Sequence, residues 1–304
     1  MKIISKKSIL SVLLTLIPAL SFCANFLLPV QGDDVVGQPQ VVQVGMNNYV
    51  SLMEQYDVGY YELVEANPGS NIEQLRSSDN IVVPTSFILP NVDRQGIVIN
   101  IAEMRMYFYP AGQNIVLTYP VGIGKSGWNT PIGKTQIVDK MPDPQWQPTP
   151  AVRADFLNKY GYPLPQYVMP GPDNPLGPYA IRLAWLTYLI HGTNNPAGVG
   201  QRSSAGCIRM LNPDVTQLYS MINVGTPVHV VYQPCKAGWQ GNVLYLEAHL
   251  PVSGYKGQSY KTVIKTAMKE RTGTIKIDWK KANQIAKLGL GIPEEVGTVV
   301  TSNS

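Results

Sequence analysis

The amino-acid sequence predicts an α+β protein of several domains: a small strand–helix–helix–strand (βααβ) unit, then a mainly β domain, then a short α/β extension. Three observations favour this class. The chain has 27 Gly and 25 Pro in 304 residues, which is typical of structure rich in turns. Hydrophobic spacing changes from helical to strand-like near residue 97 and becomes helical again after residue 259. With 44% hydrophobic and 14% charged residues, the chain is globular.

The N-terminus has the pattern of a signal peptide. Three lysines lie in the first seven residues, a mostly apolar run covers residues 9–20, and small residues follow at Ser21, Cys23 and Ala24. The apolar run is short for a bilayer span. We therefore predict a signal peptide over residues 1–24 and an exported protein, with an uncleaved membrane anchor as the alternative.

The charge balance argues against a nucleic-acid partner. The chain carries 24 Lys and Arg against 20 Asp and Glu, and three of the lysines belong to the predicted signal peptide. The remaining chain is close to neutral and lacks a basic footprint. No later stretch reaches the roughly 18 apolar residues of a membrane helix, so we expect no transmembrane segment after signal removal.

A compact unit is expected between residues 41 and 90, after a segment at 25–40 that we interpret as a linker or an edge segment. The runs "VVQV" and "NIVVP" have the composition of strands. Apolar residues at helical spacing predict two helices between them. These residues are Tyr49, Leu52, Met53 and Tyr56 in the first helix, and Tyr60, Leu63 and Val64 in the second.

This order of elements, with "YDVG", "LVEANPG" and "IVVP", resembles a LysM domain, a module that binds the glycan strands of peptidoglycan. The opening differs from the family pattern, because Gly45 is followed by Met46, Asn47 and Asn48 in place of Asp-Thr-Leu. The resemblance implies a glycan-binding anchor. A structural spacer that has lost its ligand is the alternative.

From residue 97 the pattern is that of a β domain. The segments "IVINI", "MRMYFY" and "NIVLTYPVGIG" are separated by connections short enough for a meander, and "TPIG" at 130–133 predicts a turn. Ten prolines between residues 142 and 178 favour an ordered loop. One helix is expected within it, capped by Thr149, begun by Pro150 and ended by Gly161.

A histidine and a cysteine stand out beyond this loop. The apolar run 183–190 predicts a buried strand with His191 at its end, and Cys207 follows in "SSAGCIRM" after a loop-forming segment that can fold back. A thiol is mostly protonated at neutral pH, whereas the thiolate is the nucleophile. An adjacent imidazole can take that proton and return it to a leaving group. On residue type and spacing alone, a structural histidine is the alternative.

Five blocks make the assignment specific. The segments "TPIGK", "VRADF", "GPDNPLGPYAIRL", "YLIHGTN" and "SSAGCIRM" occur in this order, and the region 96–234 closely resembles an L,D-transpeptidase (YkuD-type) catalytic domain. The nearest branch is that of enterobacterial periplasmic enzymes acting on peptidoglycan. The resemblance implies that Cys207 is the nucleophile, that His191 is the general base and acid, that the Gly192 carbonyl orients the ring, and that the Gly206 backbone belongs to the oxyanion region.

The same resemblance places three further residues. Ser204 and Arg209 match motif positions and are candidates for substrate binding, with Arg209 facing a stem-peptide carboxylate. A buried structural ion pair is an equal alternative for Arg209. Ala205 stands where many members have histidine, so any help from that second imidazole is absent here.

The implied reaction is acyl transfer on a peptidoglycan tetrapeptide stem. Cys207 attacks the bond between diaminopimelate and D-alanine, releases D-alanine, and passes the acyl group to an amine. That amine is either a second diaminopimelate side chain or a lysine of an outer-membrane protein. Water as acceptor would make the chain an L,D-carboxypeptidase, and a non-enzymatic wall-binding protein is the remaining alternative. The resemblance implies a periplasmic location and no metal or cofactor.

Two other uses of the cysteines compete with catalysis. In an oxidising compartment Cys207 and Cys235 could form a disulfide, which would silence the enzyme. Alternatively, His191, Cys207, His229 and Cys235 could bind zinc, although no two of them have the close spacing of a typical ligand pair.

The extension at 235–304 is predicted from local patterns. The segment "GNVLYLEAHL" has the composition of a strand, one helix is expected from Tyr260 until Gly273, and Asp278 is a cap for a second helix. We expect the last residues, "GTVVTSNS", to be frayed.

Overall fold

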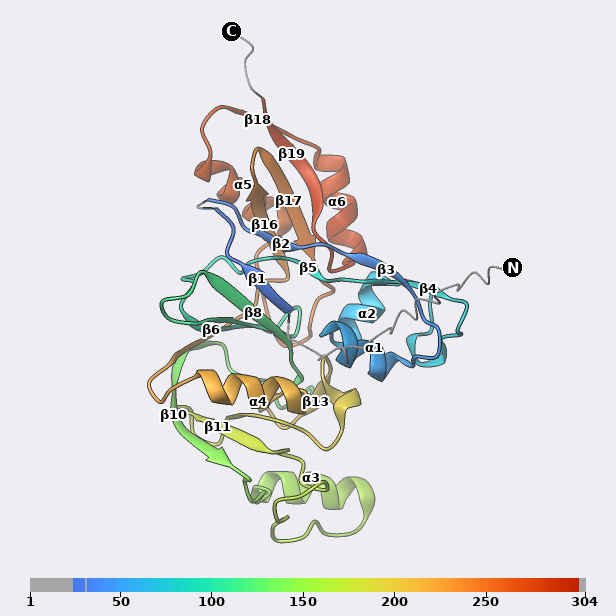
Figure 1. Cartoon of the computed structure of the whole chain (residues 1–304), viewed down its shortest axis with the longest axis vertical. Helices are drawn as coiled ribbons and strands as arrows, with labels where there is room; N and C mark the ends of the chain where they lie inside the picture. Colours follow the sequence, from blue (N-terminus) through green and yellow to red (C-terminus); the bar gives the residue numbers. More distant parts are fainter. Residues whose placement is uncertain (1–23, 31, 301–304) are drawn as a thin grey trace, which may run out of the picture.

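The computed structural model describes residues 24–30 and 32–300. All of the predicted signal peptide except Ala24 lies outside these residues. Among the described residues, no helix is long and apolar enough to cross a membrane. The molecule is elongated, with the C-terminal extension at one end and the helix α3 at the other (Figure 1).

A nine-stranded mixed sheet forms the centre of the molecule. Its first strands confirm the predicted meander, because β8, β7 and β6 are antiparallel neighbours. In spatial order the strands are β1 (Ala24–Leu27), β8 (Ile115–Pro120), β7 (Arg105–Tyr109), β6 (Gly96–Asn100), β15 (Pro227–Val231), β10 (Gly133–Pro142), β11 (Tyr179–Leu183), β12 (Leu189–His191) and β14 (Ile208–Arg209). Helix α4 (Asn212–Met221) packs on β11. Two further strands, β9 (Ile123–Gly124) and β13 (Arg202–Ser204), form a small parallel pair.

The segment 25–40 is part of the fold rather than a free linker. Strand β1 pairs with β8 at the edge of the large sheet, and β2 (Val35–Gly37) pairs with β5 (Ser86–Ile88). Pairing satisfies backbone groups of both short strands, which holds residues 24–27 and 35–37 in the fold. Of the two interpretations, the edge segment describes it better.

Residues 40–83 fold in the order strand, helix, helix, strand. The elements are β3 (Gln40–Gln43), α1 (Tyr49–Tyr56), α2 (Tyr60–Ala66), the 3-10 turn η1 (Ile72–Gln74) and β4 (Asn80–Val83). Strands β3 and β4 pair antiparallel. The hydrophobic core of this unit continues into the next domain, because Val199 and Leu211 pack within it. The unit therefore docks tightly on the catalytic region. Its identity as a LysM domain stays a prediction.

The C-terminal extension is a separate small α/β layer. Its sheet has the order β16 (Cys235–Gln240), β17 (Val243–Ala248), β19 (Glu294–Val300) and β18 (Thr274–Ile277). Helices α5 (Tyr260–Ala267) and α6 (Trp279–Leu288) pack on it, with the short η3 (Met268–Glu270) after α5. The expected fraying is wrong for "GTVV", because these residues belong to β19, which lies between two partner strands; residues 301–304 lie outside the described residues.

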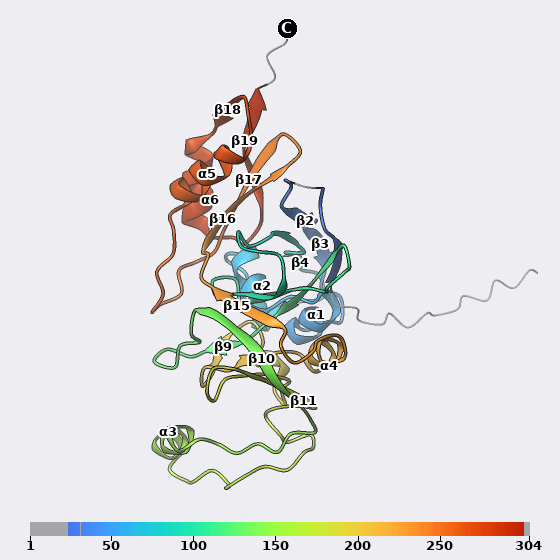
Figure 2. The ribbon, with the colours of Figure 1, turned by 90° about the vertical axis from the view of Figure 1, so that its left-hand side faces the viewer.

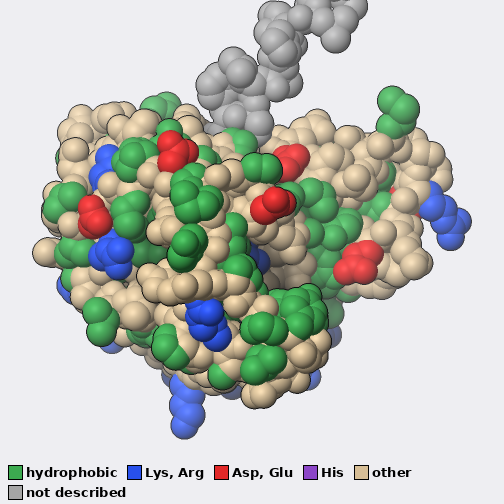
Figure 3. Space-filling view, turned by 90° about the horizontal axis from the view of Figure 1, so that it is seen from below, with side chains coloured by type: hydrophobic (Ala, Val, Ile, Leu, Met, Phe, Trp, Pro, Cys, Tyr) green, Lys and Arg blue, Asp and Glu red, His purple; other side chains and the backbone are tan. Residues whose placement is uncertain are grey.

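The proline-rich loop extends away from the body of the protein (Figure 2). Its helix α3 (Pro150–Tyr160) has the predicted cap at Thr149 and ends at Gly161, whose φ of 78° favours glycine. None of the helix's residues is buried. Seen from this end, hydrophobic, acidic and basic side chains are interspersed, so this face carries no field of a single sign (Figure 3).

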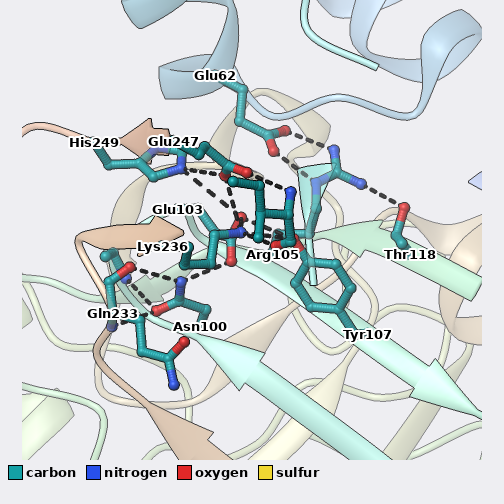
Figure 4. A network of polar contacts seen from close by, with 12 residues as sticks. Glu62, Asn100, Glu103, Arg105, Tyr107, Thr118, Gln233, Lys236, Glu247 and His249 are labelled. Carbon is teal, nitrogen blue, oxygen red and sulfur yellow. Dashed lines mark hydrogen bonds and ion pairs between the residues drawn. The ribbon is translucent and has the colours of Figure 1, made fainter. Parts of the chain in front are cut away.

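A buried cluster of charges joins the three parts of the chain (Figure 4). We call it the charged junction, and it consists of Glu65 from α2, Glu103 from the loop after β6, and Lys236, Glu247 and His249 from the extension. Lys236 Nζ lies 2.7 Å from Glu103 and 2.9 Å from Glu247, while the His249 ring contacts Glu65 at 2.8 Å and Glu247 at 2.9 Å.

The charged junction holds its own cation. Glu103, Glu247 and His249 are close enough together to ligate a metal ion. However, the ammonium of Lys236 lies between the two carboxylates and already supplies the positive charge there. A second buried pair, Arg105 with Glu62 at 2.6 Å, ties the central sheet to α2. Both groups hold the N-terminal unit and the extension against the central sheet.

Candidate active site

His191 is positioned by a hairpin that the sequence analysis did not foresee. The run 183–190 is two strands, because the chain turns at 184–188, where Leu183 N–H donates to Tyr188 O at 3.1 Å. The expected single strand is therefore wrong. The turn has Leu186 88% exposed and Thr187 at a φ of 69°. It lets β12 return beside β11, so that His191 ends an inner strand of the sheet.

The pairing of β12 with β14 brings the histidine and the cysteine near one another. The two strands run parallel, with Ile190 opposite Ile208 and His191 opposite Arg209. Directly opposite residues of paired strands point to the same side of a sheet. Both isoleucines face the core, so His191 and Arg209 face the other side. Cys207 directly precedes β14, and the charge of Arg209 acts on both its thiol and the His191 ring, so the three groups lie near one another.

The His191 ring has a defined orientation and charge. Its Nδ1 lies 2.6 Å from the Gly192 carbonyl oxygen, which can only accept a hydrogen bond, so Nδ1 carries the proton and Nε2 is the basic nitrogen. Burial, followed by the positive charge of Arg209, lowers the pKa of His191 to about 4, against the smaller effect of the Gly192 carbonyl. The imidazole is therefore neutral at pH 7 and able to accept a proton.

Gly192 is required for close packing. A Cβ added there would lie 2.5 Å from Asn212 Oδ1. That oxygen accepts from the Thr193 N–H at 2.8 Å, which fixes the chain just beyond the carbonyl. The carbonyl that orients His191 is thus held by its neighbours.

Cys207 is a free thiol that requires a base. Its Sγ contacts the Thr187 carbonyl oxygen at 3.6 Å. Burial raises the pKa of this thiol, while the backbone of Leu189 and the charge of Arg209 oppose the shift. The side chain is nevertheless partly exposed. When a protonated thiol and a neutral imidazole come into contact, the proton can pass from sulfur to nitrogen.

The loop before Cys207 is held through its backbone. Ser204 Oγ accepts from the Gly206 N–H at 3.1 Å and donates to the Cys207 carbonyl at 2.6 Å. Gly206 has a φ of 106°, and a Cβ there would lie 2.9 Å from the Tyr188 ring. Ser204 is 5% exposed, and its contacts favour a loop-shaping role over the predicted substrate contact.

Arg209 is a cation without a carboxylate neighbour. Its Nη1 donates to Ser203 Oγ at 2.9 Å, whereas its buried Nε has no hydrogen-bond partner among the described residues. No ion pair involving Arg209 is found within residues 24–30 and 32–300, so the alternative of a structural ion pair gains no support. Burial lowers the pKa of the guanidinium. The guanidinium can therefore donate hydrogen bonds to a carboxylate.

The competing uses of the cysteines are not seen. Cys207 and Cys235 are both free thiols, and burial raises the pKa of Cys235 to about 11. Among the described residues, one group of side chains could hold a metal ion, and it is that of the charged junction. It contains none of the four residues of the zinc alternative. The predicted disulfide and zinc alternatives are therefore absent from this part of the chain.

The sequence analysis did not identify two residues, distant in the sequence, that support the loop before Cys207. Thr130 donates to the Gly206 carbonyl at 2.8 Å, and Tyr255 of the extension donates to the Thr130 carbonyl at 2.9 Å. Thr130 lies in "TPIGK", one of the five blocks that resemble the family, and this block is the sequence feature that could have indicated it. Nothing local marked Tyr255.

Comparison with known proteins identifies the chain. Residues 94–230 match the model of the L,D-transpeptidase catalytic domain. The probable L,D-transpeptidase ErfK/SrfK of Salmonella typhimurium is 41% identical over 243 residues, covering 78% of each chain, and its Escherichia coli counterpart is 36% identical over 288 residues, covering 91% of this chain and 92% of that one. The solved L,D-transpeptidase from Mycobacterium smegmatis is 22% identical, covers 49% of this chain and 63% of its own, and has a TM-score of 0.36. The chain therefore belongs to the L,D-transpeptidases, a family of cysteine acyltransferases that act on peptidoglycan stem peptides.

Proposed function

We propose that Cys207 is the nucleophile and His191 the general base and acid of this L,D-transpeptidase. The observation that carries the proposal is the β12–β14 pairing, which brings both residues near one another while Nδ1 is tied to the Gly192 carbonyl. Nε2 is then left to exchange protons with the thiol and with amines.

In the first half of the reaction, Cys207 Sγ attacks the carbonyl carbon of diaminopimelate in a tetrapeptide stem. The thiol proton passes to His191 Nε2, and the backbone N–H groups near Gly206 and Cys207 face the developing oxyanion. When the intermediate collapses, the bond to D-alanine breaks and His191 gives its proton to the leaving amine. A thioester and free D-alanine result.

In the second half, an amine attacks the thioester. His191 takes the amine's proton and returns it to the departing sulfur, which restores the thiol. The buried, unpaired Nε of Arg209 supports a role for this residue in binding a stem-peptide carboxylate. We propose a diaminopimelate side chain as the acceptor, with a lysine of an outer-membrane protein and water as the other outcomes.

The test uses the purified protein and a disaccharide tetrapeptide. Cys207→Ala should abolish D-alanine release and crosslink formation, since it removes the thiol that we propose forms the thioester. Cys235→Ala is the matched control, because it removes the other described thiol and should leave both activities unchanged. Undiminished D-alanine release by Cys207→Ala would overturn the assignment.

The acceptor is tested on cell walls. Mass spectrometry of muropeptides from a deletion strain should show fewer crosslinks between third-position residues. Loss of wall-bound protein remnants instead would favour the lysine acceptor, and loss of tripeptides alone would favour water.

We further propose that residues 41–90 bind glycan and that the protein acts in the periplasm. The strand, helix, helix, strand order supports the first proposal. Binding of Cys207→Ala protein to purified sacculi should weaken in Met46→Glu, a fully exposed site in this unit, but not in Leu27→Glu, an exposed site outside it. The N-terminal sequence of the protein from a periplasmic extract should begin near residue 25.

A further inference from the structure

The peptide bond between Gly206 and Cys207 has one end anchored and one end free. Its carbonyl oxygen accepts from Thr130 Oγ1 at 2.8 Å. Cys207 precedes β14, and no turn, loop or side-chain hydrogen bond among the described residues uses the Cys207 N–H. In a trans peptide the C=O and N–H point in opposite directions. The N–H of Cys207 therefore points away from Thr130.

Thr130 can hold this carbonyl in one direction only. Its hydroxyl accepts from the Gly124 N–H at 3.1 Å, so the hydroxyl proton is directed to Gly206. The side chain is 1% exposed. Its own carbonyl accepts from the Tyr255 hydroxyl at 2.9 Å. The threonine is thus anchored on both sides and has little freedom to turn.

The Thr130 hydroxyl contacts the backbone at a glycine, where the backbone has the greatest conformational freedom. Glycine populates positive φ readily, and Gly206 has a φ of 106°. Its N–H is held by Ser204, but that bond leaves the following peptide plane free to rotate. Ser204 also holds the Cys207 carbonyl beyond this plane, whereas the Thr130 hydroxyl is the contact made to the Gly206 carbonyl within it.

We propose that Thr130 is a positioning residue of the transferase: by holding the Gly206 carbonyl, it aims the Cys207 N–H at the oxyanion of the tetrahedral intermediate. This inference rests on the proposed nucleophile. It goes further because it assigns the control of an oxyanion donor to a buried threonine that lies 77 positions before the cysteine.

The test separates acyl transfer from simple reactivity of the thiol. Thr130→Val removes the hydroxyl at constant size, Thr130→Ser keeps it, and Thr135→Val is the matched control, since its buried hydroxyl has no partner among the described residues. Two rates are measured for each: kcat for D-alanine release, and alkylation of Cys207 by iodoacetamide. Alkylation displaces iodide at a saturated carbon and builds no oxyanion.

For Thr130→Val we expect kcat to fall at least about tenfold, bounded by the roughly 10²–10³ lost when an oxyanion donor is removed. KM and the alkylation rate should stay within about twofold, Thr130→Ser should recover most of kcat, and Thr135→Val should match the parent. An unchanged kcat in Thr130→Val overturns the proposal. So does a parallel fall in alkylation, which would show a collapsed loop.

These outcomes are distinct from failure of the proposed function. If Cys207→Ala remained active, the nucleophile itself would be wrong. If Cys207→Ala is inactive and Thr130→Val retains full kcat, only the positioning role fails. Thermal unfolding of each variant shows whether it is folded, and Thr130→Ser keeps the test decisive if the valine variant is unstable.

Discussion

Two buried histidines in different regions of the molecule have opposite charge states. His191 in the active site and His249 in the charged junction are each no more than 5% exposed. Burial lowers the pKa of both rings. At His191 the charge of Arg209 adds to that effect and the pKa is about 4, whereas at His249 the carboxylates of Glu65 and Glu247 outweigh it and the pKa is about 10.

The difference distinguishes the groups that we propose react from the groups that hold the fold. In the charged junction every charge has a partner, and Lys236 has two carboxylates. In the candidate active site, within residues 24–30 and 32–300, Arg209 forms no ion pair and the His191 ring makes one hydrogen bond, to a backbone carbonyl. Unpaired polar groups are costly to bury, but they remain available to a substrate.

The largest effect is expected at the reactive histidine. His191→Gln keeps a similar size but cannot exchange protons, so kcat for D-alanine release should fall by about 10²–10⁴. His229→Gln is the control, since this histidine lies on β15, which β10 and β11 separate from β12. Equal losses in the two variants would contradict the role of His191.

The charged junction should respond through stability instead. Lys236→Met removes the cation shared by Glu103 and Glu247, and breaking a buried pair in this way costs about 3–5 kcal/mol. Urea unfolding measures this loss. Lys236→Met combined with Glu103→Gln should recover part of it, because fewer uncompensated charges remain. A loss below about 1 kcal/mol in the single variant would mean that water reaches the cluster.

The charged junction also marks where sequence analysis ends. The helix α3 was predictable because Thr149, Pro150 and Gly161 are local signals, and the histidine–cysteine pair followed from ordered blocks of the family. The partners Glu65 and His249 lie far apart in the chain, and their contact leaves no local pattern.

The same limit explains the errors. The turn at 184–188 lies in an apolar run without Gly or Pro, so no local residue type marked it. Residues 297–300 were expected to fray, yet they belong to β19, which pairs on both sides. The strand, helix, helix, strand unit was recognisable, but not that its core would share Val199.

Opposite pKa shifts predict opposite pH dependence of folding. The folded-state pKa of His249 is about 10, above the unfolded value near 6.5, so its contribution is complete below pH 6.5 and is lost as the pH rises through 10. The folded-state pKa of His191 is about 4, so its contribution is complete above pH 6.5 and is lost as the pH falls towards 4.

Two variants isolate how each histidine makes the free energy of unfolding depend on pH. The free energy of unfolding of the wild type relative to His249→Gln should fall between pH 6.5 and 10, and relative to His191→Gln it should fall between pH 6.5 and 4. Each slope is at most about 1.4 kcal/mol per pH unit. Urea unfolding across this range measures both. Slopes of the same sign would break the comparison between the two histidines.

The smallest effect is expected at an exposed ion pair formed by the proline-rich loop. Lys125, beside the active-site loop, contacts Asp155 of α3 at 2.7 Å, and the two side chains are 37% and 41% exposed. Water and salt screen such a pair, so Asp155→Asn should cost less than about 1 kcal/mol, and less still at high salt. The same urea measurement sets this value beside that of Lys236→Met. Equal losses would mean that pairing alone, rather than burial of the pair, decides what a charge contributes to this fold.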